Sequence, residues 1–311
     1  MNFFIECILL TFNLTSIFMM SLLRWIIPTK HKSVKDEVCL VTGAGSGIGR
    51  LLAFEFAKRG AVLILWDIDN IGNRETADMI EKIGGKVFFE NCDVSDREEI
   101  YKMAQKARME AGDVTILVNN AGIVYGKDFM EITDEEIEKT IKVNSLAHFW
   151  TVRAFLPRML ENNHGHIVTV ASVLGLIPLP GMTEYIASKF ASVGFNHGLE
   201  LELRKYQKDG VKTTLACPHH TNTGMFSGLT YRFPSLLKPL EPFECVESIM
   251  HAILTNRSMV VIPRSMYFSY NMSTWMPHAA TLAISKFTGI LKSMESFIPT
   301  RDYQKKAAKI E

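Results

Sequence analysis

A glycine-rich turn between an apolar run and a helical pattern is the feature that most constrains this chain. Residues 38–41 are uninterrupted apolar, which is typical of a buried strand. They are followed by Thr42-Gly43-Ala44-Gly45-Ser46-Gly47-Ile48-Gly49, and residues 50–59 then have the pattern of a helix. Bare glycine backbone lets a pyrophosphate approach, and the positive end of the helix dipole favours its charge. The arrangement predicts a dinucleotide-binding site, with a plain structural turn as the alternative.

Strand-like and helix-like segments alternate through the middle of the chain. Further strands are expected at residues 62–66, 86–90, 115–118, 167–170 and 211–216, with amphipathic helices between them. Such alternation implies right-handed crossovers and a parallel sheet covered on both faces. We therefore expect an α/β fold, a single Rossmann-like, doubly wound parallel sheet, over residues 36–265.

Polar residues mark the starts of two of these helices. Ser95 with Glu98, and Thr133 with Glu136, have the spacing of capping boxes. Two further helices are expected, over about residues 74–83 and over about residues 183–203. These patterns locate the helices that separate the strands.

An acidic residue ends the second predicted strand. Asp67 lies eighteen residues after Gly49, and its neighbours Ile68, Asp69 and Asn70 bring no basic side chain. A carboxylate there can accept hydrogen bonds from both ribose hydroxyls of adenosine and would repel a 2′-phosphate. Asp67 therefore predicts NAD rather than NADP, and a helix N-cap is the alternative role.

Tyr185 and Lys189 are four residues apart and so lie on one face of a helix. A free Tyr loses its proton near pH ~10, and a nearby ammonium would lower that pKa toward the range useful for acid–base catalysis. Ser172, thirteen residues before Tyr185, can hydrogen-bond the same substrate oxygen. Taken alone, the spacing is also compatible with an ordinary amphipathic helix that carries a surface lysine, so the rest of the chain must supply the context. The glycine turn, Asp67, Asn119, Ser172 and Pro218 all follow strands, so they are expected to meet in one crevice.

Composition excludes several other classes of function. The 311 residues are 47% hydrophobic and 22% charged, with a net charge of +1, which argues against nucleic acid as a partner. The five cysteines are dispersed, which indicates reduced thiols in a reducing compartment. His164 and His166 lie in a sequence typical of a turn and have no spaced Cys or acidic partner. We expect no metal site.

The N-terminal stretch predicts a membrane anchor over residues 1–30. Residues 3–23 are almost wholly apolar, interrupted mainly by Glu6 and Asn13, and would form a helix of roughly 30 Å. Trp25 and the basic residues Arg24, Lys30, Lys32 and Lys35 indicate a membrane interface with the following domain on the cytoplasmic side. A signal peptide would have basic residues before the apolar run and a small-residue cleavage site after it, and neither is present. The helix would span the bilayer or lie in one leaflet, and a buried core helix is the alternative.

Together the motifs resemble the short-chain dehydrogenase/reductase family over roughly residues 36–265. They occur in the family's order and spacing: Thr42-Gly43-xxx-Gly47-Ile48-Gly49, Asp93, Asn119-Asn120-Ala121-Gly122, Asn144, Ser172 and Tyr185-xxx-Lys189. The anchor, Leu65-Trp66-Asp67-Ile68 and Thr223-Gly224-Met225-Phe226 are similar to a membrane-anchored subgroup that acts on retinol and 17-beta-hydroxysteroids. Within it, Pro234-Ser235-Leu236-Leu237 is most similar to the retinol enzymes.

The resemblance implies a role for each matching residue. Tyr185 would be the acid/base, Lys189 would hold the nicotinamide ribose and lower the pKa of Tyr185, Ser172 would fix the substrate oxygen, and Asn144 would anchor a proton-relaying water. Asn119 would contact the adenosine side of the cofactor. The whole implied NAD site comprises Gly43, Ser46, Gly47, Ile48, Gly49, Asp67, Asp93, Val94, Asn120, Ala121, Gly122, Tyr185, Lys189, Pro218, Thr221 and Thr223. One departure is His219, where the family usually has glycine after the proline.

The loops expected around the substrate are apolar. Residues 173–180 follow Ser172, and Met225, Phe226, Leu229, Tyr231, Phe233, Leu236 and Leu237 form the other loop. Such apolar loops favour a lipophilic alcohol over a sugar as the substrate. The alternative is that these residues only pack the core. The extension at residues 266–311 is rich in apolar residues, so it predicts either a second membrane-facing or lid helix or one that merely covers the core.

The resemblance therefore implies an NAD-dependent oxidoreductase that interconverts a lipophilic alcohol and its carbonyl, with all-trans-retinol and retinal as the nearest pair. A 17-beta-hydroxysteroid or a long-chain fatty alcohol is the alternative substrate. A lipid-droplet or membrane interaction protein with weak turnover is the alternative class. The resemblance also implies a homodimer at the endoplasmic reticulum membrane or a lipid droplet, with the catalytic domain cytoplasmic.

Overall fold

The computed structural model describes residues 3–26, 29–234 and 238–297. Contacts between residues divide the chain into two units, Met1–Lys32 and Ser33–Glu311. The first unit contains α1 (Phe3–Ile26), and its segment Phe3–Met20 has a mean hydropathy of 1.8 with none of it buried. The hydroxyls of Thr11, Thr15 and Ser16 donate to carbonyls four residues earlier, so they need no water partner. By length and composition this helix can cross a membrane.

The second unit is built on one parallel sheet of seven strands. Their order is β3-β2-β1-β4-β5-β6-β7. The strands are β1 (Val38–Thr42), β2 (Val62–Asp67), β3 (Val87–Asn91), β4 (Ile116–Asn119), β5 (Gly165–Val170), β6 (Val211–Pro218) and β7 (Met259–Ile262). The chain moves outward from β1 to β3 and then returns to place β4 on the other side of β1. This reversal forms a topological switch point, where ligands bind in such sheets.

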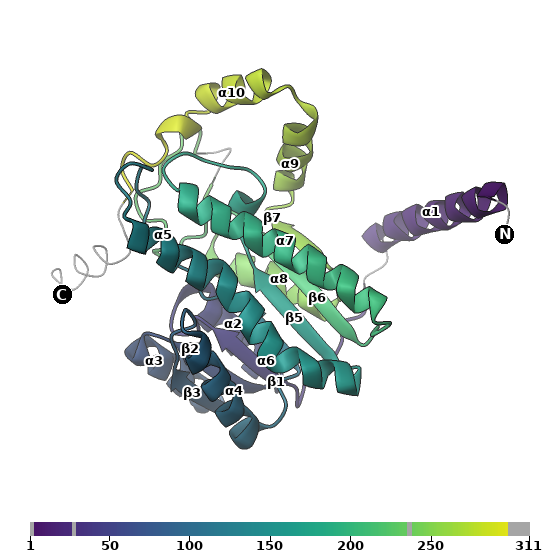
Figure 1. Ribbon diagram of the computed structural model, residues 1–311, viewed down its shortest axis with the longest axis vertical. Coiled ribbons are helices and arrows are strands. Elements are labelled where there is room, and N and C mark those ends of the chain that lie inside the picture. The colour runs from purple at the N-terminus through teal and green to yellow at the C-terminus, as the bar shows by residue number, and fades with distance from the viewer. Residues whose placement is uncertain (1–2, 27–28, 235–237, 298–311) are drawn as a thin grey trace. The chain divides into compact units, whose positions relative to one another are not determined.

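Helices cover both faces of the sheet. The helices of this unit are α2 (Gly47–Ala57), α3 (Asn70–Lys82), α4 (Arg97–Ala111), α5 (Asp134–Ile141), α6 (Ala147–Asn162), α7 (Thr183–Lys205), α8 (Pro242–Leu254), α9 (Ser265–Trp275) and α10 (His278–Phe287), of which α10 lies beyond the end of the sheet (Figure 1). α6 and α7 lie in front of the strands in Figure 1. The doubly wound α/β architecture expected from the alternating pattern is confirmed.

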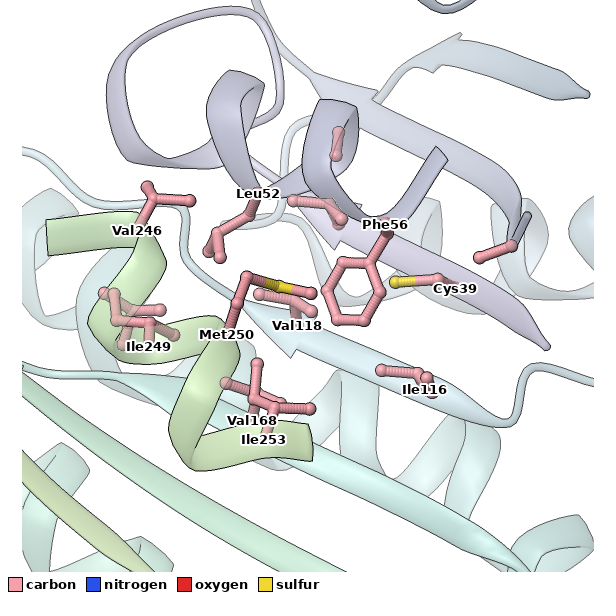
Figure 2. Packing of buried hydrophobic residues seen from close by; sticks show 14 of the residues in the cluster. Cys39, Leu52, Phe56, Ile116, Val118, Val168, Val246, Ile249, Met250 and Ile253 are labelled. Atoms are coloured by element: carbon pink, nitrogen blue, oxygen red, sulfur yellow. The ribbon is translucent and has the colours of Figure 1, made fainter. Parts of the chain in front are cut away.

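Two apolar cores sandwich the sheet. On one face Leu52 and Phe56 of α2 and Met250 of α8 pack on strand residues such as Cys39 and Val118 (Figure 2). On the other face Leu40, Leu117 and Ile167 pack against α4, α6 and α7. Successive strand residues are thus buried on opposite faces, which explains why the strands read as unbroken apolar runs.

Some local expectations were wrong. Ser95 does not cap α4, because Asp96 lies closer to the helix start and accepts from the backbone of Glu98 and Glu99. α3 begins at Asn70, earlier than expected, because the Asp69 carboxylate accepts from its first turn. The capping box of Thr133 and Glu136 is confirmed.

Two further differences lie at strands. His166 is not in a turn: it is buried in β5, and its ring bonds the Thr214 hydroxyl at 2.8 Å. β7 was not predicted, because a strand of four residues is too short to show a clear hydrophobic pattern.

Candidate active site

A cavity of about 280 Å³ opens at the carboxyl ends of the strands. It brings together most of the predicted site residues, namely Gly43, Ser46, Gly47, Ile48, Asp67, Asp93, Val94, Asn120, Ala121, Gly122, Ser172, Tyr185, Lys189, Pro218, Thr221 and Thr223. Gly49, Asn119 and Asn144 do not line it. The convergence expected from the strand ends is therefore found for side chains that are far apart in sequence.

The glycine turn is held by residues that follow β4. The Asn120 side chain donates to the carbonyl oxygens of Thr42 and Gly43 at 3.0 and 3.1 Å. The Thr42 hydroxyl in turn accepts from the backbone N–H groups of Asn120 and Ala121. Gly49 is required by close approach, since a Cβ there would lie 2.0 Å from the Gly43 oxygen. The turn at the N-terminus of α2 is thus rigid before any phosphate arrives.

The side chain of Asn119 differs from expectation. It is 1% exposed, and its Oδ1 accepts from Thr151 of α6 at 2.7 Å. The side chain points into the core between sheet and helix and does not line the cavity, so it is not placed for the predicted contact with the adenosine side of the cofactor. β4 ends at Asn119, and the alternation along a strand turns the next residue, Asn120, toward the cavity.

Asp67 lines the cavity at the end of β2. Its two carboxylate oxygens accept from the backbone N–H groups of Gly45, at 2.7 Å, and Asp69, at 2.8 Å. Burial raises the pKa of Asp67, and these two hydrogen bonds oppose that rise. The helix N-cap is Asp69, so Asp67 does not have the alternative role of capping α3.

Asp93 shares its end of the cavity with a lysine that the sequence analysis missed. Lys139 of α5 donates to the Asp93 carboxylate at 2.7 Å and to the Ser95 hydroxyl at 2.6 Å. Burial alone would raise the pKa of Asp93, but the hydrogen bonds from Lys139 and Ser95 outweigh it and lower the pKa. No local signal connects Lys139 with a residue 46 positions earlier.

Tyr185, Ser172 and Lys189 lie together in the same cavity. Tyr185 and Ser172 are both buried, and the Ser172 hydroxyl accepts from the Leu174 backbone N–H at 3.1 Å and lies near enough to Tyr185 to lower its pKa. The Lys189 Nζ donates to the Val170 carbonyl oxygen at 3.0 Å and lies 5.6 Å from the centre of the Tyr185 ring. The three groups therefore come from two elements: Ser172 lies in the turn after β5, and Tyr185 and Lys189 lie on α7.

The expected lowering of the Tyr185 pKa is not found. Burial raises this pKa, and the hydrogen bond with Ser172 opposes the rise only in part. Lys189 is not among the causes of this shift, and its ammonium donates to the Val170 carbonyl oxygen. Burial also lowers the pKa of Lys189 itself, to about 8.

Asn144 lies in a π-helical turn, Lys142–Leu146, between α5 and α6. Its amide pairs with both backbone groups of Ile123, at 2.8 and 2.9 Å, and donates to the Ser188 hydroxyl at 3.0 Å. A Cβ on Gly122 would lie 3.4 Å from Asn144 Oδ1 and 3.6 Å from Lys189 Nζ, so these two atoms face a common space. Single π-turns inside helices often occur at functional sites.

His219 and His220 belong to the cavity wall. The Tyr231 hydroxyl lies 3.4 Å from a ring nitrogen of His219 and 3.2 Å from one of His220. Burial lowers the pKa of both histidines, that of His219 to about 4, so His219 is neutral at physiological pH. His219 stands where the family usually has glycine, and its ring packs on Tyr231 with the two ring planes tilted. The loop still places Thr221 and Thr223 in the cavity wall.

The part of the cavity near Tyr185 is apolar. Leu174, Leu179, Met182, Met225, Phe226 and Leu229 line it. In the predicted loop of residues 173–180, Val173, Leu176 and Ile177 pack in a core cluster with residues of β6 and α9. Part of this loop therefore lines the cavity, and part of it packs the core. Phe233 stacks on Phe287, and the predicted Leu236 and Leu237 lie outside the described residues.

Comparison with known proteins agrees with this geometry. Residues 37–231 match the family model described as short chain dehydrogenase. The chain is 45% identical to retinol dehydrogenase 10 of Rattus norvegicus, over 97% of this chain and 96% of that protein.

Solved structures give the same result. A short-chain dehydrogenase/reductase from Burkholderia phymatum in complex with NAD matches with a TM-score of 0.70 and 28% identity, over 77% of this chain and 93% of that one. A metagenomic short-chain oxidoreductase in complex with NADP matches with a TM-score of 0.64 and 26% identity, over 74% and 98% of the two chains. The chain belongs to the short-chain dehydrogenase family.

Proposed function

We propose that this protein is an NAD-dependent oxidoreductase that converts all-trans-retinol to retinal. The observation that carries the proposal is the position of Tyr185, which adjoins the dinucleotide cradle on one side and an apolar compartment on the other. The 45% identity to retinol dehydrogenase 10 over nearly the whole chain supports retinol as the substrate.

Tyr185 would take the proton of the alcohol while the Ser172 hydroxyl holds the same oxygen. The nicotinamide supplies a hydride acceptor for the carbinol carbon. Lys189 would bind the nicotinamide ribose, and its ammonium, 5.6 Å from the centre of the Tyr185 ring, would oppose the burial that raises the Tyr185 pKa. A water between Asn144 and Lys189 would carry the proton outward, which is supported by the common space that these two side chains face.

We propose NAD rather than NADP as the working cofactor. The Asp67 carboxylate, with no basic neighbour in residues 68–70, would accept from the adenosine ribose and repel a 2′-phosphate. At the other edge Asp93 and Val94 would contact adenine, with Lys139 holding the Asp93 carboxylate in place. Across the cavity Thr223 would meet the nicotinamide carboxamide.

We further propose that the protein works at the endoplasmic reticulum membrane or a lipid droplet, with its catalytic domain in the cytoplasm. The exposed apolar helix α1 supports an anchor over residues 1–30, either through the bilayer or in one leaflet. Exposed apolar residues of α9 and α10, namely Phe268, Trp275, Leu282, Ile284 and Phe287, support the membrane-facing reading of the C-terminal extension. Phe149 on α6 and Phe190 on α7 are also exposed and support a homodimer through these helices.

The test is NADH formation by the membrane-bound protein with all-trans-retinol, a steroid 17β-alcohol and a long-chain fatty alcohol, each with NAD and NADP. Preferential oxidation of retinol with NAD is the expected result. Faster turnover of another alcohol would keep the mechanism and replace the substrate. Tight NAD binding without turnover of any alcohol would favour the alternative, a membrane interaction protein, and His219 would then be the residue to change to glycine.

A further inference from the structure

The C-terminal segment of residues 288–297, called the strap here, lies outside the matched family region and outside the predicted catalytic domain. It follows α10 and contains a short 3-10 turn, Ile290–Lys292. Ser293 in its middle is 1% exposed, so the strap is packed into the protein and is not a loose tail.

Hydrogen bonds attach the strap to the substrate loop, defined here as residues 224–233. The backbone N–H of Thr230 donates to the Ser293 carbonyl oxygen at 3.1 Å, and the Ser296 hydroxyl donates to the Gly228 carbonyl oxygen at 2.8 Å. Just before the strap, Arg232 donates to the Phe287 oxygen at 2.8 Å. The Arg232 guanidinium also lies near both the Phe233 and the Phe287 rings, 5.3 and 5.6 Å from their centres.

Two side chains of the strap reach the walls around Tyr185. Phe297 packs on Phe226 of the substrate loop, with ring centres 6.5 Å apart, and Phe226 meets the Tyr185 ring edge-on at 5.6 Å. Phe297 also lies against the loop after β4, so close that a Cβ on Gly126 would be 2.1 Å from its ring. Met294 lies beside Gly181, just before α7, where a Cβ would be 3.1 Å away.

The strap therefore touches three segments around the apolar compartment: the substrate loop, the loop after β4 and the turn before α7. Met294 and Phe297 pack in one cluster with Val124, Met182, Tyr185, Leu174, Leu179, Met225 and Phe226. They do not line the cavity themselves; they lie behind residues that do. Without them, Phe226 would keep its contact with Tyr185 but lose the support on its outer side.

We propose that Met294 and Phe297 are positioning residues of the active site, which hold the substrate loop closed on Tyr185 and give the enzyme its preference for long apolar alcohols. The inference rests on the proposed function, because it concerns the compartment that would receive the polyene chain. An alcohol with a short chain occupies only the part next to Tyr185 and Ser172, so its turnover depends less on the strap.

The test compares Met294→Ala and Phe297→Ala with a control, Leu291→Ala, in the full-length protein in membranes. Leu291 belongs to the same strap and is 46% exposed, so its truncation removes similar apolar volume without touching the compartment. The kcat/KM for all-trans-retinol is divided by that for 3-methylbut-2-en-1-ol, an allylic alcohol of short chain. We expect this ratio to fall about tenfold in the two variants, mainly through KM for retinol, while the Kd of NAD and the control stay unchanged.

Ratios within about twofold of the wild type in both variants would overturn the inference. A wild-type enzyme that turns over a steroid or fatty alcohol but not retinol would instead overturn the proposed substrate. The ratio would then be measured with the alcohol that is turned over.

A second measurement keeps the test independent of activity. Amide hydrogen exchange in residues 224–233 of the NAD-bound protein should be faster in Phe297→Ala than in the control, since the Thr230 amide depends on the strap. Equal exchange in the two variants would refute the positioning role.

Discussion

The Lys189 ammonium donates a hydrogen bond to the Val170 carbonyl oxygen, 3.0 Å away, and not to the Tyr185 hydroxyl. The lysine that belongs to the family's Tyr-xxx-Lys pattern is thus tied to the end of the neighbouring strand β5. Its ammonium is buried and has no carboxylate partner among the described residues, and burial lowers its pKa to about 8. This relationship has a measurable consequence for stability.

Replacing Lys189 with methionine should make the NAD-free protein less dependent on pH between 8 and 10.5. In the wild type the unfolded chain holds the Lys189 proton up to about pH 10.4, whereas the folded protein releases it near 8. The unfolded state then binds more protons in this window, so wild-type stability rises with pH, by a total of the order of 3 kcal/mol. Denaturant unfolding at several pH values would measure the difference. Parallel pH dependence of the two proteins would contradict it.

Tyr185→Phe should abolish turnover while leaving NAD binding intact. The change removes only the hydroxyl that exchanges the substrate proton, and acid–base groups of this kind contribute about 10²–10⁴-fold to rate. Steady-state kinetics and NAD titration would measure the two effects. The matched control is Tyr206→Phe, at the exposed end of α7, which should keep full activity. Wild-type rates in Tyr185→Phe would exclude the proposed mechanism.

Asp67→Asn should weaken the preference for NAD over NADP. The amide keeps the size of the side chain but removes the charge that repels a 2′-phosphate. We expect the ratio of kcat/KM for NAD to that for NADP to fall at least about tenfold, which corresponds to about 1.4 kcal/mol. Asp78→Asn, on the exposed side of α3, is the control. An unchanged ratio would show that Asp67 does not select the cofactor.

His148→Phe should make the protein more resistant to mild acid. The His148 ring is buried on α6, both its nitrogens lack a hydrogen-bond partner among the described residues, and burial lowers its pKa to about 3. Between pH 6.5 and 3 the unfolded state binds the proton and the folded state does not, so wild-type stability falls as pH falls.

From pH 7 to pH 5 this loss is about 2 kcal/mol for one such histidine. Thermal unfolding at both pH values would show a smaller fall in Tm for the variant than for the wild type. The comparison between pH values cancels any packing cost of the phenylalanine. An equal fall in both proteins would be evidence against a neutral His148.

Deletion of residues 1–30 should move the protein from the carbonate-resistant membrane fraction toward the soluble or loosely bound one. α1 is the helix that is long and apolar enough to span a bilayer among the described residues. Sedimentation after carbonate extraction measures the change. Arg24→Gln is the control, since it alters one flanking charge and leaves the apolar run. Unchanged retention of the deleted protein would assign the anchor to the C-terminal extension.

The sequence by itself determined the alternating α/β fold, the glycine turn and most residues of the site. These features depend on local patterns: apolar runs, glycines that precede a helix, and the Tyr-xxx-Lys spacing on one helical face. Each pattern depends on the conformation of its own segment, so it can be recognised without knowledge of distant contacts. The helix cap of Thr133 and Glu136 belongs to the same class.

Only the tertiary structure decided which partners those residues meet. It directed Asn119 into the core, gave Lys139 to Asp93, turned Lys189 toward Val170 and placed Phe297 behind Phe226. Each contact joins elements that are distant along the chain or depends on competition between burial and hydrogen bonding. The raised pKa of Tyr185 has the same origin, since burial outweighs the opposing hydrogen bond with Ser172. Such outcomes are set by packing, which a linear pattern does not encode.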